Sequence, residues 1–138
     1  AITLGATISE FPTTVAAASA ANNAGMSTIM GGPNVVRGGS HSGNVSAADL
    51  SDKGLLDALS SDYVPSSLLY GAFLLNDKQG LSLPDAIATV TTNPARMANF
   101  NDRGEIKAGL RADLIQVKRC TDGTPIVRKT FKLGERVA

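Results

Sequence analysis

The sequence predicts an α/β fold followed by a small antiparallel β tail, and three observations support this prediction. Short apolar runs alternate with helix-like segments three times in the first half of the chain. Strands that alternate with helices imply right-handed crossovers and parallel pairing. The pattern changes after Gly104, where two strand-like runs flank an Asp122-Gly123 turn. Three strand–helix units are too few to close a barrel, so they predict an open three-stranded sheet or the last part of a barrel.

The predicted strands are short, apolar and bounded by turn residues. Three belong to the α/β part, at residues 1–8, at 27–30, and at 55–59 leading into Ser60-Ser61-Asp62. Two belong to the tail, at 112–117 and 126–133, with a last tight turn at Gly134-Glu135.

Helices are predicted where a proline or a capping residue comes before an apolar segment. They are an alanine-rich helix at 15–21 with Pro12 in its first turn, a short helix from Ser46 and Asp49 to Gly54, a helix at 66–76 that follows Pro65, and a helix from Ser82 and Pro84 through Thr92. Residues 31–44 are expected to form a long glycine-rich loop.

Composition narrows the class of protein. The 138 residues fit one domain, and a net charge of +1 without a basic stripe argues against nucleic-acid or anionic-membrane partners. The apolar runs are far shorter than the roughly 18 residues of a spanning helix, and no charged-then-apolar leader is visible. A single cysteine, Cys120, excludes an internal disulfide and favours a cytoplasmic location. Because a strand-like run begins at Ala1, we expect a segment of a longer protein.

Polar residues follow each of the three predicted parallel strands, where such folds place their chemistry. Glu10 follows the first predicted strand, the 37–44 loop follows the second strand, and Asp62 follows the third strand. Asp62 can bind a divalent cation or accept a proton, or it can simply cap a helix. Glu10 is more readily explained as a cap for the helix at Pro12.

The 37–44 loop, Arg37-Gly38-Gly39-Ser40-His41-Ser42-Gly43-Asn44, suits an oxyanion ligand. Its glycines let the backbone come close and expose N–H donors, and an arginine can hold phosphate oxygens with paired hydrogen bonds. It matches neither a Walker A loop nor a serine-hydrolase elbow, and a flexible surface loop is the alternative. His41 is the only histidine, so this chain cannot form a multi-histidine metal site by itself.

Two segments of the second half carry a family resemblance. Thr91-Thr92-Asn93-Pro94-Ala95-Arg96 is similar to a segment of the amidohydrolase superfamily, and the run from Gly104 through Ile106, Gly109, Ala112 and Asp113 to Leu114 resembles its signature. The resemblance implies that residues 1–103 are strands six to eight, with helices, of a TIM-like (β/α)8 barrel. It implies that residues 104–138 are the tail of a small β-sandwich.

The first half resembles the phosphonate-metabolism branch of that superfamily. The resemblance is carried by residues 9–14, Gly32-Pro33-Asn34, the 37–44 loop and residues 60–67. It implies hydrolysis of alpha-D-ribose 1-methylphosphonate 5-triphosphate, with release of pyrophosphate, in the carbon–phosphorus lyase pathway. It also implies a divalent metal, zinc or similar, with its remaining ligands upstream of this chain.

The resemblance places Asp62 as metal ligand and proton acceptor, whereas Glu10 and His41 are weaker metal candidates. We expect contacts to the phosphorylated sugar phosphonate from eight residues: Arg37, Gly38, Gly39, Ser40, His41, Asn44, Tyr63 and Ser66. Two alternatives stay open, a hydrolase of C–N bonds and a non-catalytic fragment. The isolated chain is expected to be inactive and to self-associate, because three barrel strands leave sheet edges and apolar faces uncovered.

Overall fold

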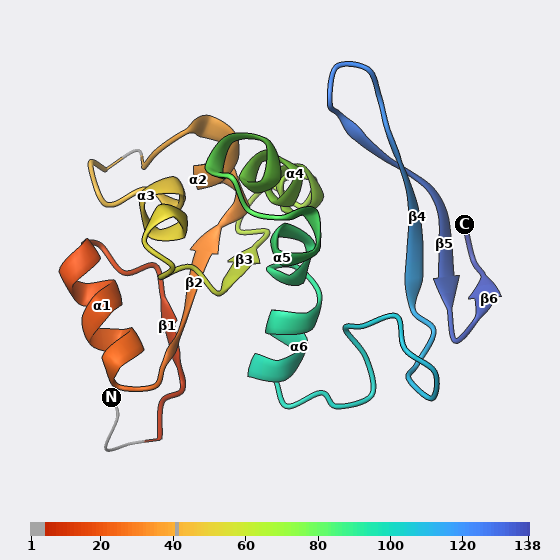
Figure 1. Cartoon of the computed structure of the whole chain (residues 1–138), viewed down its shortest axis with the longest axis horizontal. Coiled ribbons are helices and arrows are strands. Elements are labelled where there is room, and N and C mark those ends of the chain that lie inside the picture. Colours follow the sequence, from red (N-terminus) through yellow and green to blue (C-terminus); the bar gives the residue numbers. More distant parts are fainter. Residues whose placement is uncertain (1–4, 41) are drawn as a thin grey trace.

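The computed structural model describes residues 5–40 and 42–138 and contains two sheets. The first is parallel, with the order β1 (Ile8–Glu10), β2 (Ser27–Gly31), β3 (Ala58–Ser60). The second is antiparallel, with the order β4 (Leu114–Arg119), β5 (Pro125–Lys132), β6 (Glu135–Arg136). Figure 1 shows the parallel sheet among the helices and the β4–β5 hairpin to one side. The predicted α/β part with an antiparallel tail is confirmed.

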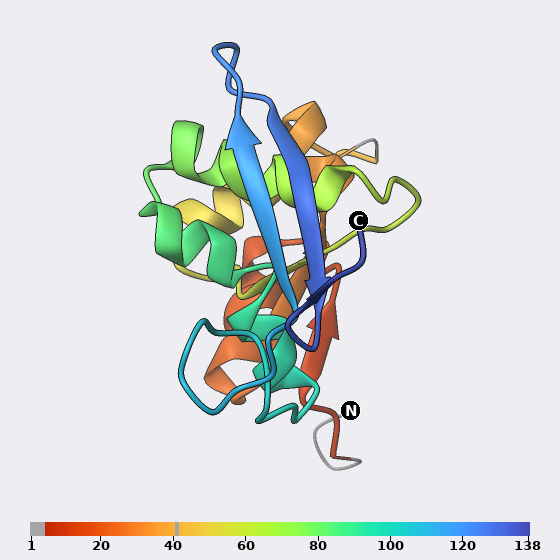
Figure 2. The same ribbon diagram turned by 90° about the vertical axis from the view of Figure 1, so that its right-hand side faces the viewer.

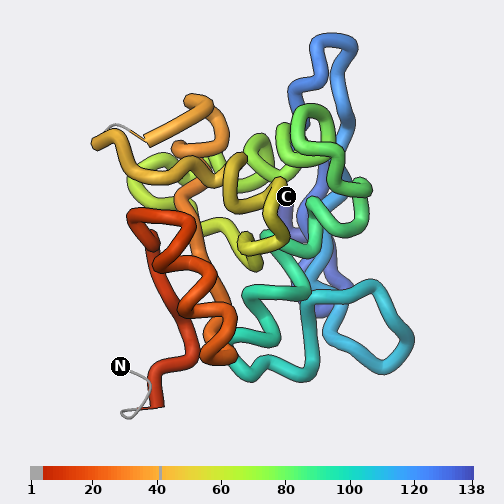
Figure 3. The backbone as a smooth tube through the Cα atoms, turned by 60° about the vertical axis from the view of Figure 1, so that its left-hand side comes forward, coloured from red at the N-terminus to blue at the C-terminus, as the bar shows by residue number. Residues whose placement is uncertain are grey.

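The helices connect and cover the parallel strands. They are α1 (Val15–Asn23), α2 (Gly32–Arg37), α3 (Ala47–Asp52), α4 (Ser67–Gln79), α5 (Leu83–Ala88) and α6 (Thr92–Met97). The tube in Figure 3 shows α1 running back beside the first two strands. Among the described residues, none of these helices combines the length and the hydropathy that crossing a membrane requires.

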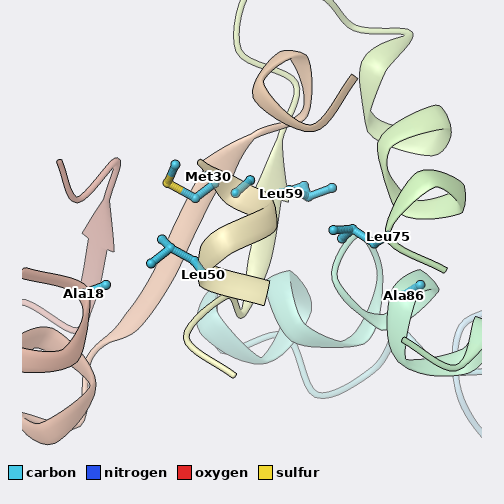
Figure 4. Packing of buried hydrophobic residues seen from close by; sticks show 7 residues of the cluster. Ala18, Met30, Leu50, Leu59, Leu75 and Ala86 are labelled. Carbon is cyan, nitrogen blue, oxygen red and sulfur yellow. The ribbon is translucent and has the colours of Figure 1, made fainter. Parts of the chain in front are cut away.

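The main core lies between the parallel sheet and the helices. Met30 and Leu59 are register partners on β2 and β3, and both are buried on the helical face of the sheet. Leu50 of α3 and Leu75 of α4 are fully buried in the same cluster, and Figure 4 shows these side chains among the strands and helices that form it. Burying such side chains is the main stabilising contribution to a fold of this kind.

Two glycines let α2 and α4 pack closely. A Cβ atom built on Gly32 would lie 2.6 Å from Ser67 Oγ and 3.0 Å from the Ser67 carbonyl oxygen. One built on Gly71 would lie 3.3 Å from Leu59 Cδ1. The Ser67 hydroxyl donates to the Val64 carbonyl at 2.6 Å, which fixes the start of α4. The segments that follow β2 and β3 are therefore held against each other.

The tail docks on the α/β part through contacts to two helices. Arg119 of β4 pairs with Asp77 of α4, and its guanidinium carbon lies 5.4 Å from the centre of the Phe73 ring. In Figure 2 the hairpin lies in front of α4. Near α6, the Thr92 hydroxyl donates to the Gly104 carbonyl at 2.6 Å.

Two family-like motif residues have structural roles. Asn93 Nδ2 donates to the Asp57 carbonyl at 2.8 Å and so holds the residue just before β3. Asp113 Oδ1 accepts from the Leu133 backbone N–H at 2.9 Å and thereby supports the turn between β5 and β6. The motifs therefore connect β3, α6 and the tail.

Three predicted strands begin later than expected, and one of them is the strand expected at 55–59, because β3 starts only at Ala58. In the first, residues 5–7 precede the strand and residues 1–4 lie outside the described part, so β1 starts only at Ile8. Its pairing is limited because β2 begins at Ser27, the register partner of Ile8. In the tail, β4 starts at Leu114 rather than at residue 112, because Ala112 accepts a hydrogen bond from the Gly134 N–H instead of joining the ladder.

Three predictions of where helices lie also need correction. Residues 31–44 are not all loop, since Pro33 lies in the first turn of α2. Pro12 lies before α1, which Thr14 caps by accepting from the Ala17 N–H at 3.1 Å. The helix expected through Thr92 is interrupted between α5 and α6. There the Thr89 carbonyl accepts from the Leu59 N–H at 3.0 Å, a contact to β3 that a continuous helix would not make.

Candidate functional site

The carboxyl ends of the three parallel strands lie at one edge of the sheet, and their next residues converge there. A Cβ atom built on Gly31, at the end of β2, would lie 3.2 Å from Asp62 Oδ2 and 3.4 Å from Phe11 Cε1. Phe11 directly follows β1, and Asp62 lies two residues after β3. The absence of a side chain at Gly31 therefore leaves the space that Asp62 and Phe11 occupy.

Asp62 and Phe11 both have left-handed backbone conformations, with φ of 50° each. Aspartate tolerates this region, but for a bulky residue such as phenylalanine it is unusual and costs on the order of 1–3 kcal/mol. The Phe11 N–H donates to the Ile29 carbonyl at 3.0 Å, which extends the β1–β2 ladder by one step and holds the turn. Such strain next to a pocket is often found at functional sites.

A pocket of about 230 Å³ opens at this edge. Its lining comes from the strand ends, from α2 and from the segment after α2: Phe11, Pro12, Met30, Gly31, Pro33, Asn34, Arg37, Gly39, Ser40, Ser42, Asn44, Val45, Asp62 and Tyr63. The structure thus brings Asp62 together with Arg37, Tyr63 and parts of the 37–44 loop. This pocket is the candidate functional site.

Arg37 and Tyr63 form a polar contact across the pocket wall. Arg37 is the last residue of α2, and its Nη2 donates to the Tyr63 hydroxyl, while Tyr63 itself directly follows Asp62. The Arg37 guanidinium carbon lies 6.0 Å from the centre of the tyrosine ring. A guanidinium has five N–H donors, so this contact leaves others for an anionic ligand.

The first glycines of the loop do not offer the free N–H donors expected from the sequence. The Gly38 N–H and the Gly39 N–H both donate to the Asn34 carbonyl, at 3.1 and 3.0 Å. Gly38 has φ of 81° and ends α2 in the left-handed conformation that glycine favours. In this structure the end of α2 uses both N–H groups, so neither is free to donate to a ligand.

The other predicted site residues have different outcomes. Glu10 is exposed at the end of β1, is not among the pocket-lining residues, and does not cap α1, because Thr14 does. Ser66 takes the N-cap position of α4, and its side chain makes no capping hydrogen bond there. His41 lies outside the described residues.

Several pocket-lining residues were not among the sequence-based candidates, and three of them, Phe11, Gly31 and Asn34, shape the site. Phe11 and Gly31 each adjoin a strand end, so their position alone could have identified them. Asn34 stood within a family-like segment, but no role was inferred for it. Its Oδ1 accepts from the Ala47 N–H at 2.8 Å, a contact between residues 13 positions apart that periodicity does not reveal.

The acidic side chains at this edge do not form a metal site by themselves. Within residues 5–40 and 42–138, no three His, Cys, Asp or Glu side chains come close enough to hold an ion. Asp62 is the carboxylate among the pocket-lining residues, and it could supply one oxygen ligand. This chain's described residues therefore fit at most part of a metal-binding site.

The sequence and structure are similar to several amidohydrolases. An enzyme of Escherichia coli K12, alpha-D-ribose 1-methylphosphonate 5-triphosphate diphosphatase, is 51% identical over 136 residues, which cover 97% of this chain but 36% of that enzyme. A dihydroorotase of Methanopyrus kandleri is 32% identical over 83 residues, or 48% of this chain and 20% of that enzyme. The chain therefore spans about a third or less of the curated relatives that it matches.

A solved structure supports the same fold. The crystal structure of an adenine deaminase superposes with a TM-score of 0.56 and 17% sequence identity, over 88% of this chain and 38% of the deaminase chain. The family model of the amidohydrolase family matches residues 4–131, almost the whole chain. The resemblance drawn from the two motifs is thus confirmed, and the chain belongs to the amidohydrolase family.

Proposed function

We propose that the chain is the C-terminal part of a metal-dependent hydrolase of phosphonate catabolism. The reaction is the release of pyrophosphate from alpha-D-ribose 1-methylphosphonate 5-triphosphate in the carbon–phosphorus lyase pathway, in the cytoplasm. The identity of 51% to the E. coli diphosphatase supports this substrate. The observation that carries the proposal is the pocket itself, which combines a carboxylate, Asp62, with a cation, Arg37, at the carboxyl ends of parallel strands.

The proposed architecture follows from the same comparison. The three parallel strands are strands six to eight of a (β/α)8 barrel, within residues 1–103. Residues 104–138 belong to a small β-sandwich. Support comes from the position of the helices, since the buried side chains of β2 and β3 face a helical layer as barrel strands do. The rest of the barrel would come from the part of the enzyme that this chain does not span.

In the proposed mechanism, Asp62 accepts a proton and Arg37 stabilises negative charge. A water molecule beside Asp62 attacks the phosphorus attached to the ribose 5-oxygen, and the carboxylate accepts the proton that the water gives up. The bond to the bridging oxygen breaks, and pyrophosphate leaves with the electron pair. Arg37, held by Tyr63, offers its remaining N–H donors to the charge that accumulates on the phosphate oxygens.

The other proposed substrate contacts come from loop residues in the pocket. Ser40, Asn44 and Tyr63 line it together with Arg37, and Gly39 lines it without a free N–H donor. Ser40 Oγ accepts from the Ser42 N–H at 3.2 Å, so the serine is partly fixed within the loop. Polar groups on a fixed loop can orient an anionic ligand at small entropic cost.

The proposed divalent metal, zinc or similar, needs ligands from outside the described residues. When bound, such an ion would lower the pKa of a coordinated water and neutralise charge on phosphate oxygens. This chain would contribute the Asp62 carboxylate. No step of the mechanism above depends on further metal ligands in this chain.

A second candidate function is hydrolysis of a C–N bond. The similarity to a dihydroorotase, 32% identical over a stretch that covers 48% of this chain, favours it. The two proposed substrates differ in charge. A triphosphate needs a cation in the pocket, whereas a neutral amide does not. Arg37 at the pocket wall therefore favours the phosphoanhydride.

A substrate panel decides between these functions. The matching third of the E. coli diphosphatase is replaced by this chain, and the chimera is assayed on the ribosyl triphosphate and on cyclic amides. We expect release of pyrophosphate without amide cleavage. Amide cleavage without pyrophosphate release would contradict the proposal and favour the second candidate.

The isolated chain is proposed to be catalytically inactive and self-associating. The β1 and β3 edges of the parallel sheet have no further partner among the described residues. Light scattering of the concentrated chain should show an oligomer. A monomer would contradict the proposed association but would leave the hydrolase function untouched.

A further inference from the structure

Asn34 is linked to both ends of the segment between α2 and α3, whose described residues 38–40 and 42–46 include five that line the pocket. Its backbone carbonyl accepts from the N–H groups of Gly38 and Gly39 at the start of the segment, at 3.1 and 3.0 Å. Its side-chain Oδ1 accepts from the Ala47 N–H just beyond the end, at 2.8 Å. One residue thus holds both ends of a loop whose glycine-rich sequence would otherwise permit many conformations.

The contact with Ala47 also satisfies a donor that the following helix cannot. Ala47 is the first residue of α3, and the first N–H groups of a helix have no partner within it. Ser46 and Asp49 form a capping box at the same helix end. The Asn34 side chain therefore joins α2 directly to the capped start of α3 and fixes the distance between them.

Asn34 is also one of the pocket-lining residues. Among the described residues, its hydrogen bond uses Oδ1, and an amide side chain also has an Nδ2 group with two donors. Asn34 lies three residues, almost one helical turn, before Arg37, which lines the same pocket. A donor that carries no charge, placed beside a guanidinium, suits the oxygens of an oxyanion.

We propose that Asn34 is a positioning residue of this pocket: its oxygens hold Gly38, Gly39 and Ala47 at the two ends of the segment between α2 and α3, and its Nδ2 donates to a phosphate oxygen of the ligand. The inference rests on the proposed function and deepens it, because it assigns a polyphosphate contact to a residue outside the loop. The two roles use different atoms of one side chain, so two substitutions separate them.

The test compares Asn34→Asp and Asn34→Ala in the 138-residue chain. Aspartate keeps an oxygen that can accept from the Ala47 N–H, but it replaces the Nδ2 donors by a second, negatively charged oxygen. Alanine removes both. Asn101→Asp is the matched control, because it adds the same charge at an exposed position outside the pocket. Inorganic pyrophosphate is the probe, titrated by calorimetry, and thermal unfolding is followed by circular dichroism.

We expect Asn34→Asp to unfold at nearly the temperature of the parent chain and to bind pyrophosphate about tenfold more weakly or worse. Asn34→Ala should lose several degrees of melting temperature as well as affinity. Asn101→Asp should bind like the parent.

Each contrary result overturns a different part of the inference about Asn34. Parent-like pyrophosphate affinity in Asn34→Asp would overturn the donor role and leave the proposed function standing. An equal loss of melting temperature in both Asn34 variants would overturn the positioning role. No pyrophosphate binding by the parent chain would overturn the inference together with the proposed pocket.

Discussion

Substitution of Gly32 by alanine should destabilise the fold at the close contact between α2 and α4. The new Cβ would lie 2.6 Å from Ser67 Oγ and 3.0 Å from the Ser67 carbonyl carbon and oxygen, so α2 and α4 must move apart. Overpacking of this kind costs about 1–3 kcal/mol. Displacing the Ser67 hydroxyl from the Val64 carbonyl costs about 1 kcal/mol more. Because alanine is a better helix former than glycine, its helix propensity offsets up to about 1 kcal/mol of this destabilisation.

The net expectation is a loss of about 1–3 kcal/mol in the free energy of unfolding, measured by urea denaturation. With the slope usual for small proteins, the midpoint should fall by about 1 M urea. Gly39→Ala is the matched control for stability, because no atom lies within 4 Å of a Cβ built there. If Gly32→Ala were as stable as Gly39→Ala, this would contradict the claim that α2 packs too closely on α4 to admit a Cβ atom at residue 32.

Two further substitutions test local contacts near the pocket and in the tail. Ser46→Ala removes the hydroxyl that accepts from the Asp49 N–H at 2.9 Å. Urea denaturation should show a loss of about 1 kcal/mol in the free energy of unfolding. An unchanged midpoint would contradict the capping box. In the tail, the Leu133 N–H and then Arg111 hold the pKa of Asp113 below its ordinary 3.8. This stabilises the fold fully above about 3.8, the ordinary pKa of the carboxyl, and the contribution is lost as the pH falls from there through the lowered folded-state pKa. Asp113→Asn should therefore flatten the acid dependence of the melting temperature, and an unchanged dependence would count against this.

The α/β order and the antiparallel tail were predictable because each element has a local signal. Strands of β-branched residues, proline before a helix and the Asp122-Gly123 turn act within a few residues. The capping box of Ser46 and Asp49 was predicted and is present for the same reason. Element ends were less predictable, because register sets them: β1 is only as long as its pairing with β2.

The site could be predicted in position but not in detail. That polar residues at parallel strand ends should meet is a general property of such sheets, and Asp62 and Arg37 do share one pocket. The role of Gly31 could not be predicted, because it depends on side chains from two other strand ends. The engaged amides of Gly38 and Gly39 were missed for a related reason: a short helix within the expected loop uses them.

The central claim, that Asp62 accepts a proton in a phosphoanhydride hydrolysis, is tested most directly by Asp62→Asn in the chimera with the E. coli diphosphatase. The account predicts that pyrophosphate release falls by about 10²- to 10⁴-fold, the usual contribution of a positioned acid–base group. Affinity for pyrophosphate should be retained, because Arg37 is unchanged and a negative charge is removed. Release of pyrophosphate at the rate of the unsubstituted chimera would contradict the claim.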